Sequence, residues 1–427
     1  MGVFTVEKGS SSKNKDLLYY FNRIGVSVLF SGAAIGVSHV VQATRAGGSY
    51  GLAIIPVVCI CLILKYPAFL FGPLYTSVTG ESVISGYLRI NKSFLFIIGL
   101  VFLSIMFTVV SAVSMLSAGI LIETFQIPLS ALWVSIILVF SSTLIVNYAS
   151  FESFQRQMKY VFFALMVLTI ISLVLAFPSI TSQTFLWDLG VGSWTKQDYI
   201  FIFALTGWMP AGLDLPMMHS QWLIAAKANN KSSSPIEDFN FGYLSTAFLA
   251  LVFILIGTIF FFGTKISFPT SAGGFAAHLL GTYKLTLGDW AVVPAGVMLF
   301  LAIYSSLIIV LDGFPRVLSE VYLKWYQRGG SPILKTEVRK ILAWIQACGA
   351  IMLLNYFASS LTALVDFATV TSFIVAALFA FLNHKLMFLD NFIQKKKISP
   401  YLLWWSRSGI ASFVTFAIFF LFINFNF

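Results

Sequence analysis

The sequence predicts an all-α polytopic membrane protein. Of its 427 residues, 59% are hydrophobic and 10% are charged, whereas a soluble domain has roughly 25% charged residues. The mean hydropathy is +0.91. The apolar residues form about eleven runs, each near the ~20 residues that an α-helix needs to cross a bilayer. We therefore expect one transmembrane domain over residues 1–427, without a soluble domain.

In chain order, each apolar run predicts one membrane span, with ends defined to within a few residues. The first five spans are 24–41, 52–75, 94–121, 129–146 and 160–177. The remaining spans are 200–224, 243–262, 291–311, 341–357, 361–382 and 402–425.

The distribution of lysine and arginine predicts the orientation, because cytoplasmic loops are enriched in these residues. With a cytoplasmic amino terminus, only Arg45, Lys196, Lys265 and Lys284 fall in outside loops, and Lys65 lies within a span. The carboxyl terminus is then outside, and we expect a multi-pass protein of the plasma or inner membrane. Because the net charge of +10 follows this topology, it does not indicate a nucleic-acid partner. The expected partners are the bilayer and a small ion or solute, and the expected state is a monomer.

Two spans contain residues that interrupt a membrane helix. Residues 31–51 include Gly32, Gly36, Ser38 and His39, and residues 206–220 include Gly207, Pro210, Gly212 and Pro216. Glycine and proline weaken a helix, and lipid cannot satisfy irregular backbone, so such segments are packed in protein or line a cavity. Paired interruptions in the two halves of a chain indicate a transporter's binding site.

Other polar residues at membrane depth are candidates for coupling or gating. Lys65 lies near the middle of a span, and we expect it to pair with an acid or with unwound backbone carbonyls. Asp366 is the expected acid, with Asp214 and Asp312 as alternatives. The pair is either structural, or the ammonium acts as a tethered coupling cation. Thr369 gives its span a polar face, and Asp214 is either a helix N-cap, a site residue or both.

Three short motifs resemble those of the Nramp-type metal transporters. They are AGGSYG at 46–51, SVTGES at 77–82 and Met209-Pro210. The resemblance implies a LeuT-type fold, with residues 24–177 and 200–382 as inverted repeats of five helices and 402–425 as an added helix. It also implies that the first and sixth spans are unwound at the membrane midplane.

The sequence departs from this family at the implied metal site. The family's metal-binding aspartate and asparagine align with Gly36 and His39, and the histidine after Met-Pro aligns with Ala211, while Met209 is retained. Imidazole and thioether groups favour softer metal ions. The resemblance thus implies a substrate site made of Gly36, Ser38, His39, Thr206, Met209, Ala211 and Asp214, with His39 and Met209 as metal ligands. Alternatively, His39 is a buried histidine bonded to a carbonyl, and Met209 fills the core.

The function we expect is secondary active transport of a divalent transition-metal ion by alternating access, with the altered site above. One alternative is transport of a non-metal small solute or anion, and another is a sensor or receptor built on a transporter scaffold. We expect no enzymatic activity and no cofactor, because the sequence has no HExxH, GxSxG or P-loop motif.

Overall fold

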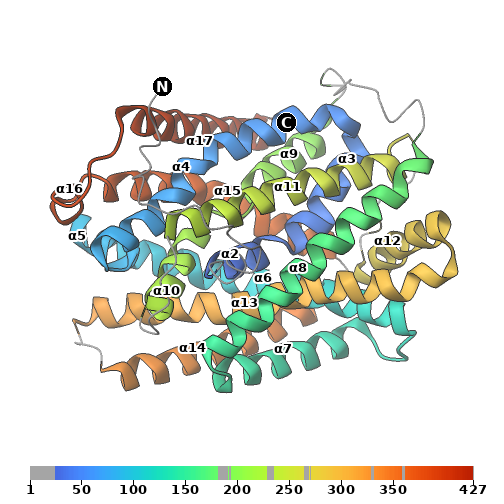
Figure 1. The fold of residues 1–427 in the computed structure, drawn as a ribbon, viewed down its shortest axis with the longest axis horizontal. Helices are drawn as coiled ribbons and strands as arrows, with labels where there is room; N and C mark the ends of the chain where they lie inside the picture. Colours follow the sequence, from blue (N-terminus) through green and yellow to red (C-terminus); the bar gives the residue numbers. More distant parts are fainter. Residues whose placement is uncertain are drawn as a thin grey trace, which may run out of the picture.

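The computed structural model describes residues 25–180, 191, 194–227, 235–263, 269, 271–327, 331–357 and 361–426. These residues form a bundle of packed α-helices, and none of the residues so described is in a β-strand (Figure 1). The all-α prediction is therefore confirmed. The predicted positions of the two chain ends, at residues 1–24 and at Phe427, lie outside the described residues.

The first half of the chain contains the first five expected spans. The first is broken into α2 (Ser27–Ala34), the π-helical turn η1 (Ser38–Ala43) and α3 (Thr44–Tyr50). The others are α4 (Ile55–Thr79), α6 (Ser93–Phe125), α7 (Ala131–Tyr148) and α8 (Phe151–Ala176), with the short helix α5 (Val83–Ile90) after α4.

The second half repeats this order. Its first span is broken into α9 (Lys196–Trp208) and α10 (Leu215–Lys227), and it is followed by α11 (Pro235–Phe261), α13 (Val292–Trp325), α14 (Pro332–Phe357) and α15 (Leu361–Leu386). The last long helix is α17 (Pro400–Asn426). The helices α12 (Ala272–Leu287) and α16 (Asp390–Ile393) lie in connections.

Within the described residues, eight segments are long and apolar enough to cross a membrane. Three of the eleven expected spans are not separate members of this set: one in each broken region, and the span in α14. The end of the first continues into α4 as a single segment, Ser38–Thr79. The halves of the second have 13 residues each, which is too short to span alone.

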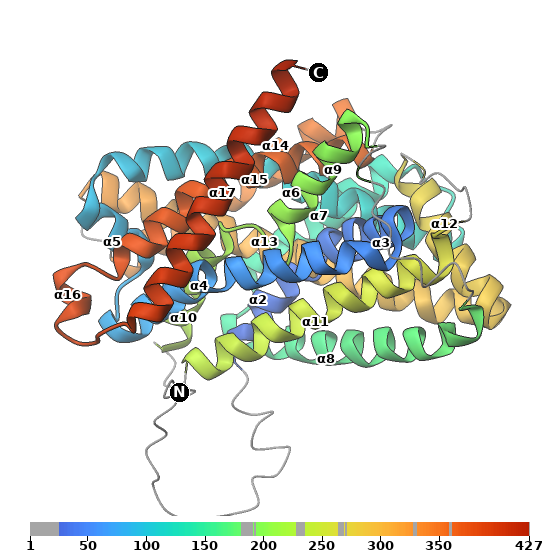
Figure 2. The same cartoon turned by 90° about the horizontal axis from the view of Figure 1, so that it is seen from above.

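The helix α11 holds the broken first span along its length, and the two lie side by side in both views (Figures 1 and 2). Asp238 of α11 accepts hydrogen bonds from the backbone N–H groups of Gly25 (2.8 Å) and Ser27 (3.0 Å) at the start of α2. A carboxylate at this end of a helix satisfies free N–H groups and complements the helix dipole. Further along, the Thr258 hydroxyl donates to the Gly47 carbonyl of α3.

The helix α4 holds the other broken span in the same way. Its Cys61 and Lys65 side chains donate to backbone carbonyls between residues 206 and 211. Its Thr76 hydroxyl is 2.8 Å from the Ser220 hydroxyl of α10. Each repeat therefore uses its second helix to hold the broken helix of the other repeat.

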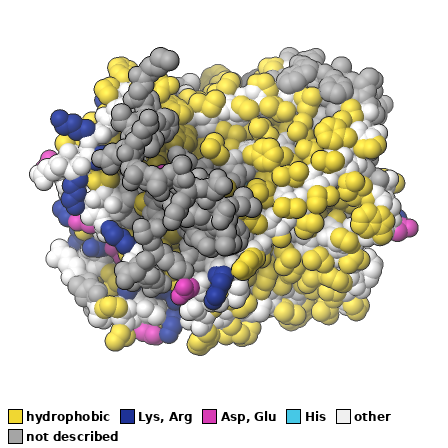
Figure 3. All heavy atoms as spheres, viewed as in Figure 1, with side chains coloured by type: hydrophobic (Ala, Val, Ile, Leu, Met, Phe, Trp, Pro, Cys, Tyr) yellow, Lys and Arg dark blue, Asp and Glu magenta, His cyan; other side chains and the backbone are white. Residues whose placement is uncertain are grey.

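The surface is that of a membrane protein. Apolar side chains cover much of the face in Figure 3, and the Lys and Arg side chains gather at the end where α5 and α16 lie. Large apolar side chains such as Ile60, Trp133 and Phe422 are more than half exposed. Because lipid rather than water suits such a surface, the chain is a multi-pass membrane protein.

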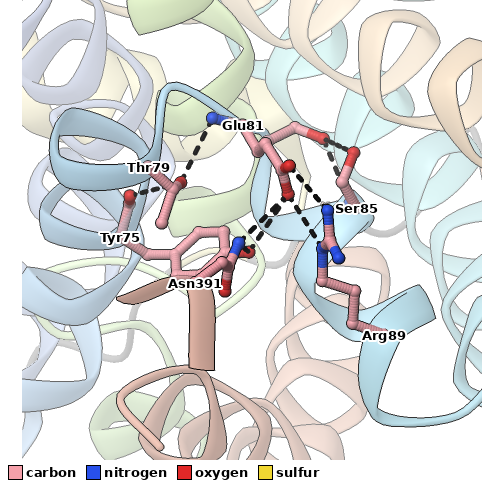
Figure 4. Close-up of polar contacts among 7 residues, drawn as sticks. Tyr75, Thr79, Glu81, Ser85, Arg89 and Asn391 are labelled. Atoms are coloured by element: carbon pink, nitrogen blue, oxygen red, sulfur yellow. Dashed lines mark hydrogen bonds and ion pairs between the residues drawn. The ribbon is translucent and has the colours of Figure 1, made fainter. Parts of the chain in front are cut away.

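At this charged end, Glu81 joins three helices (Figure 4). It follows α4 and accepts hydrogen bonds from Arg89 of α5, at 3.1 Å from Nε and 2.7 Å from Nη2. It also accepts from Tyr75 and from Asn391 of α16. The bonded guanidinium of Arg89 holds the pKa of the Glu81 carboxyl below its usual value.

We expect Arg89→Ala to lower thermal stability slightly, and only above acidic pH. Since the pKa of Glu81 is lower in the folded state, its stabilising contribution is present above the unfolded value of about 4.3 and is lost as pH falls through the folded value. Both side chains are at least a third exposed, so the effect is about 0.2–1 kcal/mol. Melting of the purified protein between pH 3 and 7 tests this, with Lys340→Ala at the exposed Glu337 pair as control. A deficit for Arg89→Ala that persists unchanged at pH 3 would contradict it.

Candidate functional site

A cavity of about 60 Å³ lies between the two broken spans. A water molecule needs roughly 10–15 Å³ of such volume, so the cavity has room for a partly hydrated ion or a small solute. Its walls come from the breaks in both spans and from α6, α13 and α15. The lining residues include Gly36, Val37, Ser38, Ile105, Val109, Trp208, Ala211, Gly212, Asp214, Met218, Ser306, Phe314 and Ser372.

The break in the first span begins where α2 ends at Ala34. The Ser306 hydroxyl of α13 lies against this break and donates to the Ile35 carbonyl at 3.2 Å. A Cβ atom on Gly36 would be only 2.7 Å from the Ser306 hydroxyl oxygen. Glycine at 36 therefore lets α13 approach the unwound backbone and keeps this side of the cavity open.

The break in the second span runs from Met209 to Asp214. Gly212 lies under the Asp214 carboxylate, because a Cβ atom there would be 2.2 Å from Asp214 Oδ1. Asp214 immediately precedes α10, and its carbonyl accepts from the Met217 N–H at 3.1 Å. Its side chain thus places a negative charge both at the start of a half-helix, where the dipole favours it, and at the cavity wall.

Four predicted site residues line this cavity, namely Gly36, Ser38, Ala211 and Asp214. The other three, His39, Thr206 and Met209, do not belong to the described residues that form its walls. The two broken spans therefore meet at one cavity, as the interrupted segments predict, but with a different set of side chains.

His39 is turned away from the cavity and is fully buried. Its Nε2 lies 2.9 Å from the Thr246 carbonyl of α11, and its Nδ1 lies 3.0 Å from the Ala34 carbonyl and 2.8 Å from the Ser38 hydroxyl. Both ring nitrogens are therefore occupied by protein groups. This geometry fits the alternative interpretation, a buried histidine bonded to carbonyls, and it does not support a metal ligand at this position.

Thr206 and Met209 contact α4 through their backbone carbonyls rather than through their side chains. The Cys61 thiol donates to the Thr206 carbonyl at 3.3 Å and to the Met209 carbonyl at 3.7 Å. The Thr206 hydroxyl is bonded to the Phe203 carbonyl within its own helix, and the Met209 side chain is fully buried. The predicted Met209 ligand is thus also unsupported by the geometry.

Lys65 pairs with unwound carbonyls and not with Asp366. Its Nζ lies 2.6 Å from the Gly207 carbonyl and 3.2 Å from the Ala211 carbonyl. Asp366 instead accepts from Arg45 of α3 at 3.3 Å. The predicted Lys65–Asp366 pair is wrong, because the fold brings Arg45 to that carboxylate.

Asp312 and Thr369 also have other partners. Asp312 accepts hydrogen bonds from Trp222, Arg316 and Arg339. Thr369 is fully buried and donates to two carbonyls in its own helix. Ser372, three residues further along α15, lines the cavity instead, and it accepts from Trp208 Nε1 at 2.9 Å.

Met218 is a cavity residue that the sequence reasoning missed. It lies four residues after Asp214, about one helical turn further along, and both residues belong to the cavity lining. The signal was present in the sequence, since Met217 and Met218 directly follow Pro216 in the interrupted segment. Among the described residues, no group of three or more His, Cys, Asp or Glu is arranged to hold a metal ion.

The sequence was compared with protein families and with individual proteins. No family model matches the sequence. An uncharacterized protein of Pasteurella multocida (strain Pm70) is 29% identical over 408 residues, which cover 94% of this chain and 92% of that protein.

Solved structures of the Eremococcus coleocola manganese transporter are similar over 97% of both chains. A mutant of that transporter gives a TM-score of 0.60 at 12% identity, and its complex with an aromatic bis-isothiourea compound gives 0.56 at 13%. At this identity the likeness establishes the fold alone. The chain thus has the all-α, LeuT-type fold of these structures.

Proposed function

We propose that this protein is a secondary transporter that binds a small cation in the cavity between its two broken spans. The observation that supports this most strongly is Asp214 at the cavity wall. An ionised carboxylate only accepts hydrogen bonds, and burying it without a partner is costly. In the part of the chain that the structure describes, no lysine or arginine lies within ion-pair distance of it, and the Lys65 ammonium acts on it only from further away. A cationic cargo would supply a direct counter-charge at the cavity, and intramembrane acids commonly serve in this way.

The first candidate cargo is a divalent transition-metal ion. Asp214 offers a carboxylate and Met218 a thioether, a pair that favours softer divalent ions over magnesium. Ser38 adds a hydroxyl oxygen that lines the same cavity. The manganese transporters with the same fold support this choice. In this proposal Asp214 and Met218 replace His39 and Met209 as the side-chain ligands.

The second candidate is a small organic cation that carries an ammonium group. It is favoured by the cavity walls, which include the apolar side chains of Ile105, Trp208 and Phe314. Such walls suit an organic solute, which needs few polar contacts. An anion is disfavoured, because Asp214 would repel it and already occupies the positive end of the α10 dipole.

Alternating access follows in this proposal from the way the helices are held. The broken spans with α4 and α11 move as one unit against the remaining helices. Polar contacts that join the unit to those helices include Arg45–Asp366, Trp222–Asp312 and Trp208–Ser372. Breaking them in turn would open the cavity to alternate sides. The Lys and Arg side chains near α5 and α16 (Figure 3) support a cytoplasmic position for that end.

Calorimetry of the purified full chain with a cation panel tests the proposed cargo. The panel is manganese, iron(II), zinc, cadmium, magnesium and methylammonium. We expect heat with the transition metals and none with magnesium. Met218→Leu should weaken cadmium more than manganese, since a thioether contributes little to a harder ion. Met352→Leu, at an exposed position of α14, is the matched control.

Two other results of this panel are informative. Binding of methylammonium without binding of metals would select the second candidate. A folded protein that binds no cation of either class would contradict the proposed function.

A further inference from the structure

Lys65 is a positive charge in an unusual place. Its side chain is fully buried in the middle of α4, where removing an ammonium from water costs several kcal/mol. Among the described residues, no carboxylate forms an ion pair with it. Asp214 acts on it electrostatically, but at longer range than a hydrogen bond. The ammonium is instead held by the carbonyls of Gly207 and Ala211.

The Gly207 carbonyl is free because α9 ends there, and the Ala211 carbonyl belongs to the unwound segment that follows. The last carbonyls of a helix have no intrahelical partner, and they carry the negative end of its dipole. One turn earlier in α4, the Cys61 thiol donates to the carbonyls of Thr206 and Met209. The two α4 side chains therefore donate to four carbonyls at the end of α9 and in the unwound segment after it.

In transporters with broken helices, carbonyls at the end of a half-helix are the groups that coordinate a coupling cation. We propose that Lys65 is a built-in cation at this position, so that the protein binds its cargo without a free sodium or potassium ion. The ammonium supplies the charge that the carbonyls require. Because Ala211 also lines the cavity, the same contact fixes one wall of the cargo site. The inference extends the proposed function by defining which coupling ion the transporter does not use.

The other titratable groups around Lys65 do not supply this charge. Cys61 is on its own helix, and Asp214 belongs to the break. Tyr243 of α11 donates its hydroxyl to the Leu62 carbonyl at 2.6 Å. None of these groups carries a positive charge, so Lys65 is the cation of this cluster.

Rescue of truncated variants by added cations tests the inference without any cargo. Lys65→Ala leaves a space that propylammonium or sodium can enter, whereas Lys65→Met fills that space with apolar atoms. We expect the melting temperature of Lys65→Ala to fall by several degrees in choline chloride and to recover in part when propylammonium or sodium chloride replaces it. Neither the wild-type protein nor Lys65→Met should show this recovery.

Lys65→Gln provides a second test if Lys65→Ala does not fold. Glutamine keeps a hydrogen-bond donor but has no charge, so we expect it to melt below the wild type. Melting of Lys65→Gln at the wild-type temperature, or of Lys65→Ala without any response to added cations, would overturn the inference. Because these readouts need no cargo, they stand apart from the cation panel, whose failure affects only the proposed function.

Discussion

Replacing Gly47 with alanine is expected to reduce the yield of folded protein to a small fraction of the wild-type yield. In the structure α3 crosses α11 so closely that a Cβ atom on Gly47 would be 2.0 Å from the Ile254 carbonyl oxygen and 2.9 Å from the Thr258 backbone nitrogen. The crossing is reciprocal, since a Cβ atom on Gly257 would be 2.2 Å from the Thr44 carbonyl oxygen. The obstructing atoms are helix backbone, which cannot rotate away as a side chain could. Small residues at such crossings are what allow membrane helices to pack closely.

Yield and melting of the detergent-purified protein measure this effect. Gly281→Ala is the matched control, because the position lies in α12 and nothing is within 4 Å of its added Cβ atom. Alanine there should be neutral or stabilise the helix by up to about 1 kcal/mol. Wild-type yield and melting temperature for Gly47→Ala would show that the α3–α11 crossing is not as close as described.

Replacing Asp214 with asparagine is expected to cost most of the affinity for the cargo. Asparagine keeps the shape of the side chain and is a good residue at the start of a helix, so the fold should be retained. It loses the charge that attracts a cation. Hydrogen bonds to charged groups contribute about 1.5–3 kcal/mol, which corresponds to a loss of about 10- to 150-fold in affinity.

The sequence predicted the helical architecture and the positions of both breaks because these are local properties. Gly36, Gly212 and Pro210 interrupt their helices wherever the neighbouring segments lie. The short helices α5 and α12 were not expected, because they lie in the connections between the long apolar runs that predict the spans.

The composition of the site was predicted less well because it depends on helix rotation and on distant partners. The π-helical turn that begins at Ser38 leaves Ser38 at the cavity and directs His39 toward the Thr246 carbonyl. An alignment of motifs carries no information about such a rotation. Similarly, whether Asp366 meets Lys65 or Arg45 is decided by where the fold places α3, whose Arg45 reaches the Asp366 carboxylate. The interpretation that Lys65 meets unwound carbonyls was correct because the break supplies unpaired acceptors close to α4.

The dissociation constant of the cargo cation for wild type, Asp214→Asn and a control variant is the most direct test of the proposed site. Asp289→Asn is a suitable control, because Asp289 is a largely exposed carboxylate paired with Lys284. Calorimetry on the three purified proteins, with the cation that gives the strongest heat for wild type, provides the comparison. The proposed site predicts that Asp289→Asn binds like the wild type and that Asp214→Asn binds about 10- to 150-fold more weakly. Equal affinity of all three proteins would show that the cargo does not bind at Asp214.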